Sequence, residues 1–304
     1  MKLAVIIVTY NAIQWHEKCL AQLSQCRFAG NVYIIDNGST DGTQDLIRTL
    51  YPEFIFYQSV VNLGFGKANN LGLKMALEDA CTHFLLLNQD ASILVEDILL
   101  LVKYQENNPH FGILSPLQMY NSEYLDRQHL KTLLVDGFEF VNDVITGKFK
   151  KEIYEIGYTN AAIWLISRNC LQKVGGFDPL FPHYGEDVEY AQRVNCVGFK
   201  VGLCPTVRGF HLRDQNSIRT LNDRHFFNSY LIKLKNLNCH FWKTYIYILI
   251  TLIVSVFGIP FGLNQKKLLM RLNAFVKITK KIKTINANRR KCFRESFAFI
   301  DYEK

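Results

Sequence analysis

The eight cysteines of this 304-residue sequence include no C-x-x-C pair and no dense spacing of the kind that a disulfide framework needs. Several of them stand among apolar residues, where a free cysteine behaves as a small hydrophobic side chain. We therefore expect buried, reduced thiols and a cytosolic compartment. The sequence also has no internal repeat and no low-complexity tract.

The N-terminus lacks the features of a secretory signal. The segment MKLAVIIVTYN has one lysine before a short apolar run, and that run ends at the polar residues Thr9, Tyr10 and Asn11. A signal peptide would continue into a longer apolar region and a cleavage site of small residues. We interpret this segment as a first β-strand.

Acidic residues are absent from residues 264–294, which contain eleven Lys or Arg. The whole chain has 35 basic and 27 acidic residues and a net charge of +8, so the remainder carries 24 basic against 27 acidic residues. The basicity belongs to this tail. It argues against a nucleic-acid partner for the body of the protein and favours an anionic surface, such as phospholipid, facing the tail.

Charge is also absent from residues 244–263, TYIYILITLIVSVFGIPFGL, and 20 such residues are long enough to cross the hydrocarbon layer. However, Gly258, Pro260 and Gly262 would interrupt the second half of a helix. A full span, a hairpin or helix lying in the interface, and a buried core helix all remain open. The cations that follow favour the interpretations in which this segment contacts a membrane, and they would keep the tail on the cytoplasmic side. We expect residues 244–294 to bind an anionic membrane surface.

Polar alternation is absent from residues 84–87, which indicates a strand buried on both faces. Similar strand-like runs occur at residues 3–8, 32–35 and 54–57, and the segments between them have helical spacing, as at Ala68, Leu71, Met75 and Ala76. This order predicts an α/β fold in which a doubly wound parallel sheet has helices on both faces.

The later part of the chain is less regular. The stretch at 118–155 is charged and contains aromatic residues, and we interpret it as an insertion beside the site and not as a separate domain. Residues 160–167 indicate a further strand, 175–185 a loop, 186–197 a helix and 218–237 a segment of helical character.

Polar residues follow three of the expected strands: Thr9-Tyr10-Asn11, then Asp36-Asn37-Gly38-Ser39, then Asn88-Gln89-Asp90. In open α/β sheets ligands bind at the carboxyl ends of the strands. The second group opens DNGSTDGT, in which Asp36 and Ser39 can bond a ligand base or cap a helix that starts near Thr43. A well-capped turn is the competing interpretation.

The segment NLGFGKANNLG at residues 62–72 sets Gly64 and Lys67 just before a helix. Free N–H groups at a helix N-terminus and a nearby lysine favour an anion such as a diphosphate. Since the segment lacks the Walker spacing, a purely structural glycine-rich turn stays open.

Asp90, at the end of a central strand, is well placed to coordinate a hard divalent cation. A second ligand must come from elsewhere, and His211 follows an expected strand end and a polar loop around Pro205. A structural role for His211 is the alternative.

Glu186 and Asp187 begin a helix, where the helix dipole favours acids. One of the two carboxylates can instead serve as a general base.

Taken together, VTYN at 8–11, DNGSTDGT, NLGFGKANNLG, LLLNQDA at 85–91, GGFDPLFPHYGED at 175–187 and His211 resemble the family 2 glycosyltransferases. The order and approximate spacing of the motifs match, the similarity is closest to the bacterial rhamnosyltransferase-like members, and it covers roughly residues 3–240. The resemblance implies an inverting enzyme with the Rossmann-like GT-A fold, a mixed and mainly parallel sheet. We expect a catalytic domain at 1–240 and an apolar, basic, helical membrane-association segment at 241–304.

By position in these motifs, the resemblance implies roles for individual residues. Asp187 would be the catalytic base, with Glu186 against the acceptor. Asp90 would contact Mg²⁺ or Mn²⁺, with His211 as a later metal or diphosphate partner; Asn88, which replaces the first acid of the family's Asp-x-Asp motif, would lie nearer the ribose. The nucleotide-sugar site would comprise Thr9, Asn11, Asp36, Asn37, Gly64, Lys67, Asn69 and Asn88.

The function implied is transfer of a sugar from a nucleotide-sugar donor, with dTDP-rhamnose favoured over UDP- or GDP-sugars, to a lipid-linked or surface-glycan acceptor in O-antigen or capsule synthesis. The protein would work in the cytoplasm at the inner face of the plasma membrane. A nucleotidyltransferase would need a phosphate loop where the chain has TYNAIQW. A non-catalytic binding module would lose Asp187, Asp90 and His211, which are all present. Nothing in the sequence predicts an oligomeric state.

Overall fold

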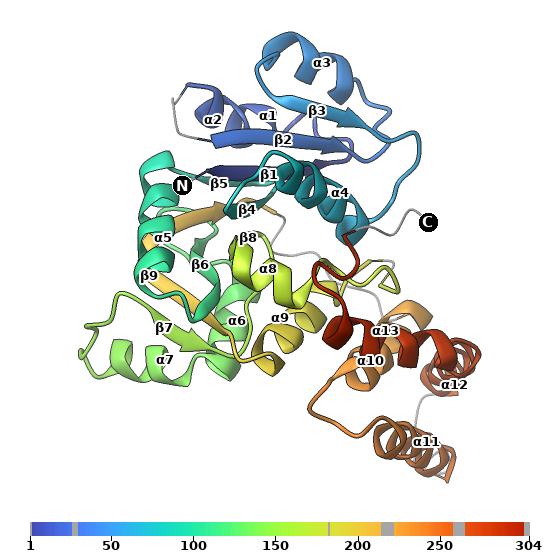
Figure 1. Cartoon of the computed structure of the whole chain (residues 1–304). Helices are drawn as coiled ribbons and strands as arrows, with labels where there is room; N and C mark the ends of the chain where they lie inside the picture. The colour runs from blue at the N-terminus through green and yellow to red at the C-terminus, as the bar shows by residue number, and fades with distance from the viewer. Residues whose placement is uncertain (1, 26–29, 182, 214–221, 258–264, 301–304) are drawn as a thin grey trace.

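The computed structural model describes residues 2–25, 30–181, 183–213, 222–257 and 265–300. In this part of the chain a nine-stranded sheet has helices on both faces, and further helices follow it at the C-terminal end (Figure 1). The expected helix breakers Gly258, Pro260 and Gly262 lie outside the described residues.

The strands alternate with helices in the first half of the chain. The strands are β1 (Leu3–Thr9), β2 (Gly30–Asp36), β3 (Ile55–Gln58), β4 (His83–Asn88), β5 (Ala91–Ile93), β6 (Phe111–Met119), β7 (Tyr154–Ile156), β8 (Ile163–Ser167) and β9 (Lys200–His211). The helices of the body are α1 (His16–Cys19), α2 (Ala21–Gln25), α3 (Thr43–Leu50), α4 (Phe65–Glu78), α5 (Val95–Asn107), α6 (Arg127–Asp136), α7 (Phe138–Ile145), α8 (Arg168–Val174) and α9 (Glu186–Cys196).

The order of strands is β3-β2-β1-β4-β8-β6-β9-β5, and β7 pairs with β9. The strands β3, β2, β1 and β4 are parallel, as predicted, whereas β8 is antiparallel to both of its neighbours. The insertion that follows β6 explains this reversal: α6 and α7 lie between β6 and β8, and the chain enters β8 beside the carboxyl end of β4. The insertion therefore lies at the edge of the sheet where the polar strand ends gather.

Both faces of the sheet are buried, because successive residues of a strand point to opposite sides. Leu3, Val5 and Ile7 of β1 belong to one core cluster, which includes residues of α1, α3 and α5. Ala4 and Ile6 belong to the other, with residues of α4, α8 and α9. The two-sided burial explains why β1 and β4 have no polar alternation.

Three boundaries differ from the sequence prediction. The strand expected at 160–167 begins at Ile163, because Asn160 turns into the loop and bonds with Gln118. The prediction of a polar loop around Pro205 is wrong. Pro205 lies inside β9, where a register shift against β6 accommodates it. Helical structure expected from residue 218 is described from α10 (Asp223–Lys235), and 218–221 lie outside the described residues.

The C-terminal helices α10, α11 (Phe241–Phe257), α12 (Gln265–Lys280) and α13 (Ile282–Arg294) enclose a third apolar core that also contains Phe181. In the described part of the chain, no helix combines the length and apolarity needed to cross a membrane. Residues 297–300 return to the body, where the N–H of Gly176 donates to Ala298 at 2.7 Å and Asn70 donates to the carbonyl of Phe299 at 3.0 Å. The end of the described chain is thus packed against the sheet domain.

Candidate active site

Asp36, at the end of β2, is fully buried and organises the first strand ends. Its Oδ1 accepts hydrogen bonds from the Thr9 hydroxyl at 3.1 Å and the Ser39 hydroxyl at 2.5 Å. Its Oδ2 accepts from the Ser39 N–H at 3.1 Å and the Gln44 amide at 2.9 Å. Four donors therefore fix this carboxylate, and Gln44 is a contact that the motif did not predict.

Asn11 and Asn37 join neighbouring loops at the same edge. Asn11, which has a positive φ of 50°, accepts from the Thr40 N–H at 2.9 Å. Asn37 accepts from the Leu63 N–H at 2.6 Å and donates to Asn62 at 3.1 Å. The loops after β1, β2 and β3 are thereby held together, and contact of Thr9, Asn11, Asp36 and Asn37 with a nucleoside stays a prediction.

The glycine-rich segment forms the N-terminus of α4, as expected. Gly64, with φ 81°, is its N-cap residue, and Lys67 is half-buried in the first turn. Asn69 is buried and donates to the carbonyl of Phe65 at 3.0 Å. A Cβ added to Gly66 would lie 3.9 Å from the Cβ of Glu186, so this helix start lies against the start of α9.

Asp90 and His211 are brought together by strand pairing, although 120 residues separate them in the chain. Ala91 of β5 lies opposite His211 of β9, and Nε2 of His211 is 3.5 Å from Oδ1 of Asp90. His211 is the last residue of its strand and is buried, whereas the Asp90 carboxylate is partly open to solvent. The two metal ligands expected from the sequence therefore share one site.

The far side of His211 holds three residues that the motifs did not indicate. Asp126 is fully buried, and its Oδ2 lies 3.7 Å from Nδ1 of His211. Its carboxylate accepts hydrogen bonds from Nη2 and Nε of Arg213 at 2.8 and 3.0 Å. The backbone N–H of His129 donates to Oδ1 of Asp126 at 2.8 Å. Burial lowers the pKa of His129 to about 4, so its imidazole is neutral at pH 7.

The donor atoms at Asp90 and His211 fit a divalent cation of the Mn²⁺ type, which accepts both carboxylate oxygen and imidazole nitrogen. Among the residues that the structure describes, no cluster of three or more His, Cys, Asp or Glu could hold a metal ion. The pair alone would therefore supply only part of a coordination shell. Ions held in this way complete their shell with substrate phosphate oxygens and water.

Asp187 is partly buried in the first turn of α9 and accepts hydrogen bonds from Tyr158 and Val188. The Tyr158 hydroxyl donates to its Oδ2 at 2.5 Å, and the Val188 N–H donates to its Oδ1 at 2.8 Å. Burial raises the pKa of Asp187, while these donors oppose the rise by stabilising the carboxylate. A carboxylate with a raised pKa is suited to accept a proton from a hydroxyl group.

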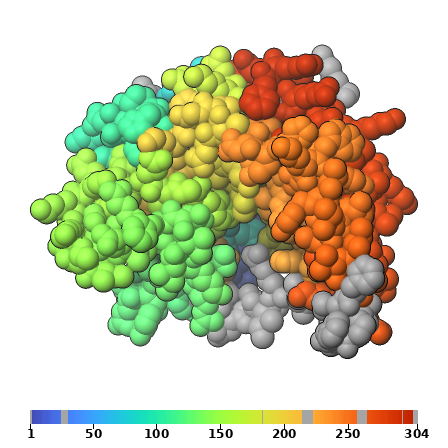
Figure 2. Space-filling view, turned by 90° about the horizontal axis from the view of Figure 1, so that it is seen from below, coloured from blue at the N-terminus to red at the C-terminus, as the bar shows by residue number. Residues whose placement is uncertain are grey.

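The loop at 158–162 joins the two halves of the site. Its first residue is Tyr158, which bonds Asp187, and its last is Ala162, whose carbonyl accepts from the N–H of Asn88 at 2.9 Å. Thr159, between them, contacts the ring of His129 at 3.0 Å. Figure 2 shows a hollow between the green segment around α6 and the orange C-terminal helices, with dark blue N-terminal atoms at its floor. One short loop therefore links Asp187 to the end of β4 beside Asp90.

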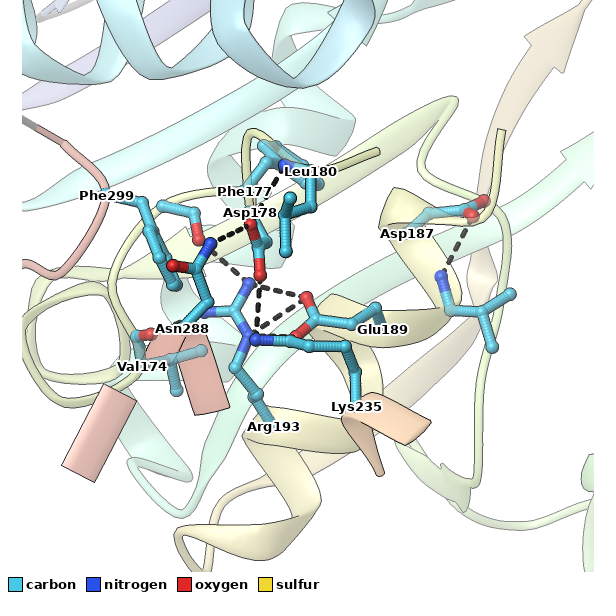
Figure 3. A network of polar contacts seen from close by, with 12 residues as sticks. Val174, Phe177, Asp178, Leu180, Asp187, Glu189, Arg193, Lys235, Asn288 and Phe299 are labelled. Carbon is cyan, nitrogen blue, oxygen red and sulfur yellow. Dashed lines mark hydrogen bonds and ion pairs between the residues drawn. The ribbon is translucent and has the colours of Figure 1, made fainter. Parts of the chain in front are cut away.

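A buried cluster of charges lies behind Asp187 on the same helix. Glu189 and Arg193 form an ion pair at 2.9 Å, and Nζ of Lys235 lies 2.7 Å from Asp178 and 3.6 Å from Glu189. Figure 3 shows these side chains pointing toward one another, with Asn288 beside Asp178 and Asp187 pointing away. Since Lys235 belongs to α10 and Asn288 to α13, the cluster ties the C-terminal helices to the helix that carries Asp187.

Comparison with solved structures defines the class of fold. The crystal structure of S. aureus TarS 1-349 in complex with UDP-GlcNAc superposes with a TM-score of 0.62 at 16% identity, over 94% of this chain and 83% of that one. A longer TarS chain is matched over 50% of its length. The mannosyltransferase PcManGT from Pyrobaculum calidifontis, in complex with GDP-Man and Mn²⁺, gives a TM-score of 0.55 at 17% identity, over 95% of this chain and 84% of that one. The fold is that of the GT-A transferases.

The sequence comparison is more specific. The profile of glycosyl transferase family 2 matches residues 4–175, more than half of the chain. N-acetylglucosaminyl-diphospho-decaprenol L-rhamnosyltransferase of Mycobacterium tuberculosis (strain CDC 1551 / Oshkosh) is 27% identical over 231 residues, which cover 69% of this chain and 75% of that protein. The chain belongs to glycosyl transferase family 2, and the expected similarity to rhamnosyltransferases is confirmed.

Proposed function

We propose that the protein is an inverting glycosyltransferase that moves a sugar from a nucleotide-sugar donor to a hydroxyl group of a lipid-linked acceptor. The relative at 27% identity is named for rhamnosyl transfer to a diphospho-decaprenol acceptor, which supports dTDP-rhamnose as the donor and a polyprenyl-linked glycan as the acceptor. UDP- and GDP-sugars are the alternative donors, because the solved structures with this fold contain UDP-GlcNAc and GDP-Man.

The observation that carries this proposal is the loop at 158–162, which joins Asp187 to the end of β4 near Asp90. In a single displacement, Asp187 takes the proton of the acceptor hydroxyl, whose oxygen forms a bond to the anomeric carbon. The bond from that carbon to the diphosphate oxygen breaks on the opposite side, and the nucleoside diphosphate leaves. One displacement inverts the configuration of the anomeric carbon.

The other side chains of the site have supporting roles in this proposal. Asp90 and His211 would hold Mg²⁺ or Mn²⁺, and the chemistry that such an ion supplies is neutralisation of charge on the departing diphosphate. Thr9, Asn11, Asp36 and Asn37 would bind the nucleoside, and Asn88 the ribose. The N-terminus of α4, with Gly64, Lys67 and Asn69, would face the donor phosphates, and Glu186 the acceptor. The buried position of Asp36 and Asn37 supports a rigid nucleoside pocket.

The C-terminal residues 241–304 would bring the enzyme to an anionic membrane from the cytoplasmic side, while 1–240 form the catalytic domain. Ile246, Ile250 and Val254 of α11 recur at helical spacing and are each more than half exposed. Ten of the eleven cations of residues 264–294 lie on α12 and α13, and Lys281 lies between these helices. Each cation near the surface would add about 1 kcal/mol of attraction to an anionic leaflet, apart from Lys277 and Lys291, which pair with acids. An acceptor anchored in that leaflet, as in O-antigen or capsule synthesis, would lie on the same surface.

The experiment that tests the function is a panel of nucleotide sugars with Mg²⁺ or Mn²⁺ and a synthetic polyprenyl diphospho-sugar acceptor. Acceptor-dependent release of nucleoside diphosphate is expected from one donor, and NMR of the product should show an inverted anomeric carbon. Retention of configuration would contradict the single displacement. Lack of turnover with every donor would contradict the proposed function.

Asp187→Asn tests the base, and Asp143→Asn is its matched control. Asp143 also accepts a hydrogen bond from a tyrosine, Tyr154, at 3.0 Å, but it lies on α7. Asp187→Asn should reduce turnover by about 10²- to 10⁴-fold, whereas Asp143→Asn should leave it unchanged. Because the pKa of Asp187 is raised in the folded state, its ionisation opposes folding above that pKa. Asp187→Asn should therefore not lower the unfolding free energy at pH 7, so a loss of turnover is not a loss of fold.

A further inference from the structure

The imidazole of His211 lies between two carboxylates of different character. Nε2 is 3.5 Å from Oδ1 of Asp90, whose side chain is 22% exposed, and Nδ1 is 3.7 Å from Oδ2 of Asp126, which is 0% exposed. His211 itself is 3% exposed. Within the described part of the chain, its buried Nδ1 has no hydrogen-bond partner at normal distance. The ring therefore has one nitrogen facing the partly open side of the site and one facing a closed polar environment.

Asp126 does not depend on His211 for its position. Arg213 donates to both of its oxygens, at 3.0 and 2.8 Å, and the backbone N–H of His129 donates to Oδ1 at 2.8 Å because Asp126 is the N-cap of α6. A carboxylate held by three donors is a fixed negative charge against which a ring can orient. The insertion between β6 and β8 thus delivers this charge to the back of the His211 ring.

A neutral imidazole carries one proton, on either Nδ1 or Nε2, and a neighbouring carboxylate stabilises the tautomer whose N–H faces it. The field of Asp126 is screened less than that of Asp90, because Asp126 is wholly buried. This difference favours the tautomer with the proton on Nδ1. The lone pair of Nε2 is then directed to the side of Asp90, where a cation would be held.

We propose that Asp126 is a positioning residue that holds His211 as the Nδ1–H tautomer and so prepares Nε2 as a metal ligand. This proposal rests on the metal site of the proposed function. Carboxylates that orient a ligating histidine typically contribute 10- to 100-fold to metal affinity. Arg213 fixes the orientation of Asp126 but also offsets part of its negative charge, so the two residues have opposite effects on the Nδ1 proton.

The test uses the full-length protein, with ¹⁵N-labelled histidine for NMR in the metal-free state and with Mn²⁺ alone for binding measured by EPR. The parent should show His211 with its proton on Nδ1. Asp126→Asn, whose neutral amide can either accept or donate, should lose this preference and bind Mn²⁺ about 10- to 100-fold more weakly. Arg213→Gln, which keeps the carboxylate, should bind Mn²⁺ at least as tightly as the parent.

The outcomes separate positioning from a merely structural role. An Nε2–H tautomer in the parent, or unchanged tautomer and Mn²⁺ affinity in Asp126→Asn, would overturn the proposal. Equal losses of Mn²⁺ affinity in Asp126→Asn and Arg213→Gln would assign both residues to local folding instead. If the parent binds no Mn²⁺, the metal site of the proposed function fails, while the tautomer in the metal-free protein still decides whether Asp126 positions the ring.

Discussion

Tyr158 and Asp187 are joined by a hydrogen bond of 2.5 Å that links the loop before β8 to the first turn of α9. The tyrosine is the donor, so it stabilises the ionised form of the carboxylate, whereas burial of Asp187 acts in the opposite direction and is the larger effect. The pKa of the candidate base therefore depends in part on a residue that stands 29 positions earlier in the chain and belongs to no recognised motif.

Replacing Tyr158 with Phe should move the acidic limb of the kcat/KM–pH profile to higher pH. The base acts when ionised, so activity falls as the pH drops through its pKa, and loss of the tyrosine donor raises that pKa further. Tyr154→Phe is the control, because Tyr154 donates to Asp143 in the same way but away from the site. An acidic limb that stays in place in Tyr158→Phe would separate Tyr158 from the titration of the base.

Replacing Lys235 with Met should lower the unfolding free energy by about 3 kcal/mol, because Asp178 and Glu189 would keep buried charge without their lysine partner. Lys277→Met is the matched control. Lys277 pairs with Asp223 at 3.6 Å, but its side chain is 56% exposed, so its loss should cost less than about 1 kcal/mol. Denaturant unfolding measures both values, and equal costs would show that the buried cluster has no special role.

Gly175→Ala should loosen the C-terminal tail from the sheet domain. A Cβ at Gly175 would lie 2.2 Å from the carbonyl oxygen of Ala298, and the residue has φ +82°. Gly198→Ala separates the two effects, because Gly198 has φ +88° but no atom within 4 Å of an added Cβ. Gly175→Ala should therefore have the lower melting temperature by several degrees, since an overpacked site costs about 1–3 kcal/mol beyond backbone strain. Equal melting temperatures would contradict tight docking of residues 297–300.

Membrane binding is better tested on the surface of α11 than by deleting the C-terminal segment, because residues 297–300 pack into the catalytic body. The double variant Ile246→Gln and Ile250→Gln should bind vesicles containing phosphatidylglycerol at least about tenfold more weakly, since each isoleucine contributes about 1.5–3 kcal/mol when fully buried.

The control for that experiment is Phe138→Gln with Ile145→Gln, on α7. These side chains are 81% and 78% exposed, more than the two isoleucines of α11, but they lie outside the C-terminal segment. This variant should co-sediment with vesicles as the parent does. Equal binding of the α11 variant and the parent would refute α11 as the contact, and equal loss in both variants would show non-specific adsorption of apolar side chains.

The sequence allowed the first half of the fold to be predicted because its strands are buried on both faces. β1 and β4 read as uninterrupted apolar runs, and their ends carry the polar residues of the site. The pairing of Asp90 with His211 was also predictable from the motif order. The course of β9 was harder to predict, because a proline such as Pro205 normally ends a strand. Only the register shift against β6 shows how Pro205 is accommodated.

The remaining site residues gave no local signal. Asp126 stands in the insertion and Tyr158 in the loop before β8, and each meets its partner only after the chain has crossed the sheet again. Lys235 is a charged residue on a helix whose sequence suggests a solvated face, yet its amine is buried among acids from two other segments. Such contacts depend on tertiary packing, which periodicity and motif spacing do not encode.

The proposed function requires that Asp90 and His211 hold a cation and that Asp187, linked to them through the loop at 158–162, act as the base. The most direct measurement is anomalous diffraction at the manganese edge from crystals soaked with Mn²⁺ and a nucleoside diphosphate. We predict a single strong peak in contact with Asp90, His211 and the diphosphate. A diphosphate bound elsewhere, or a manganese peak that touches neither Asp90 nor His211, would contradict the proposed function.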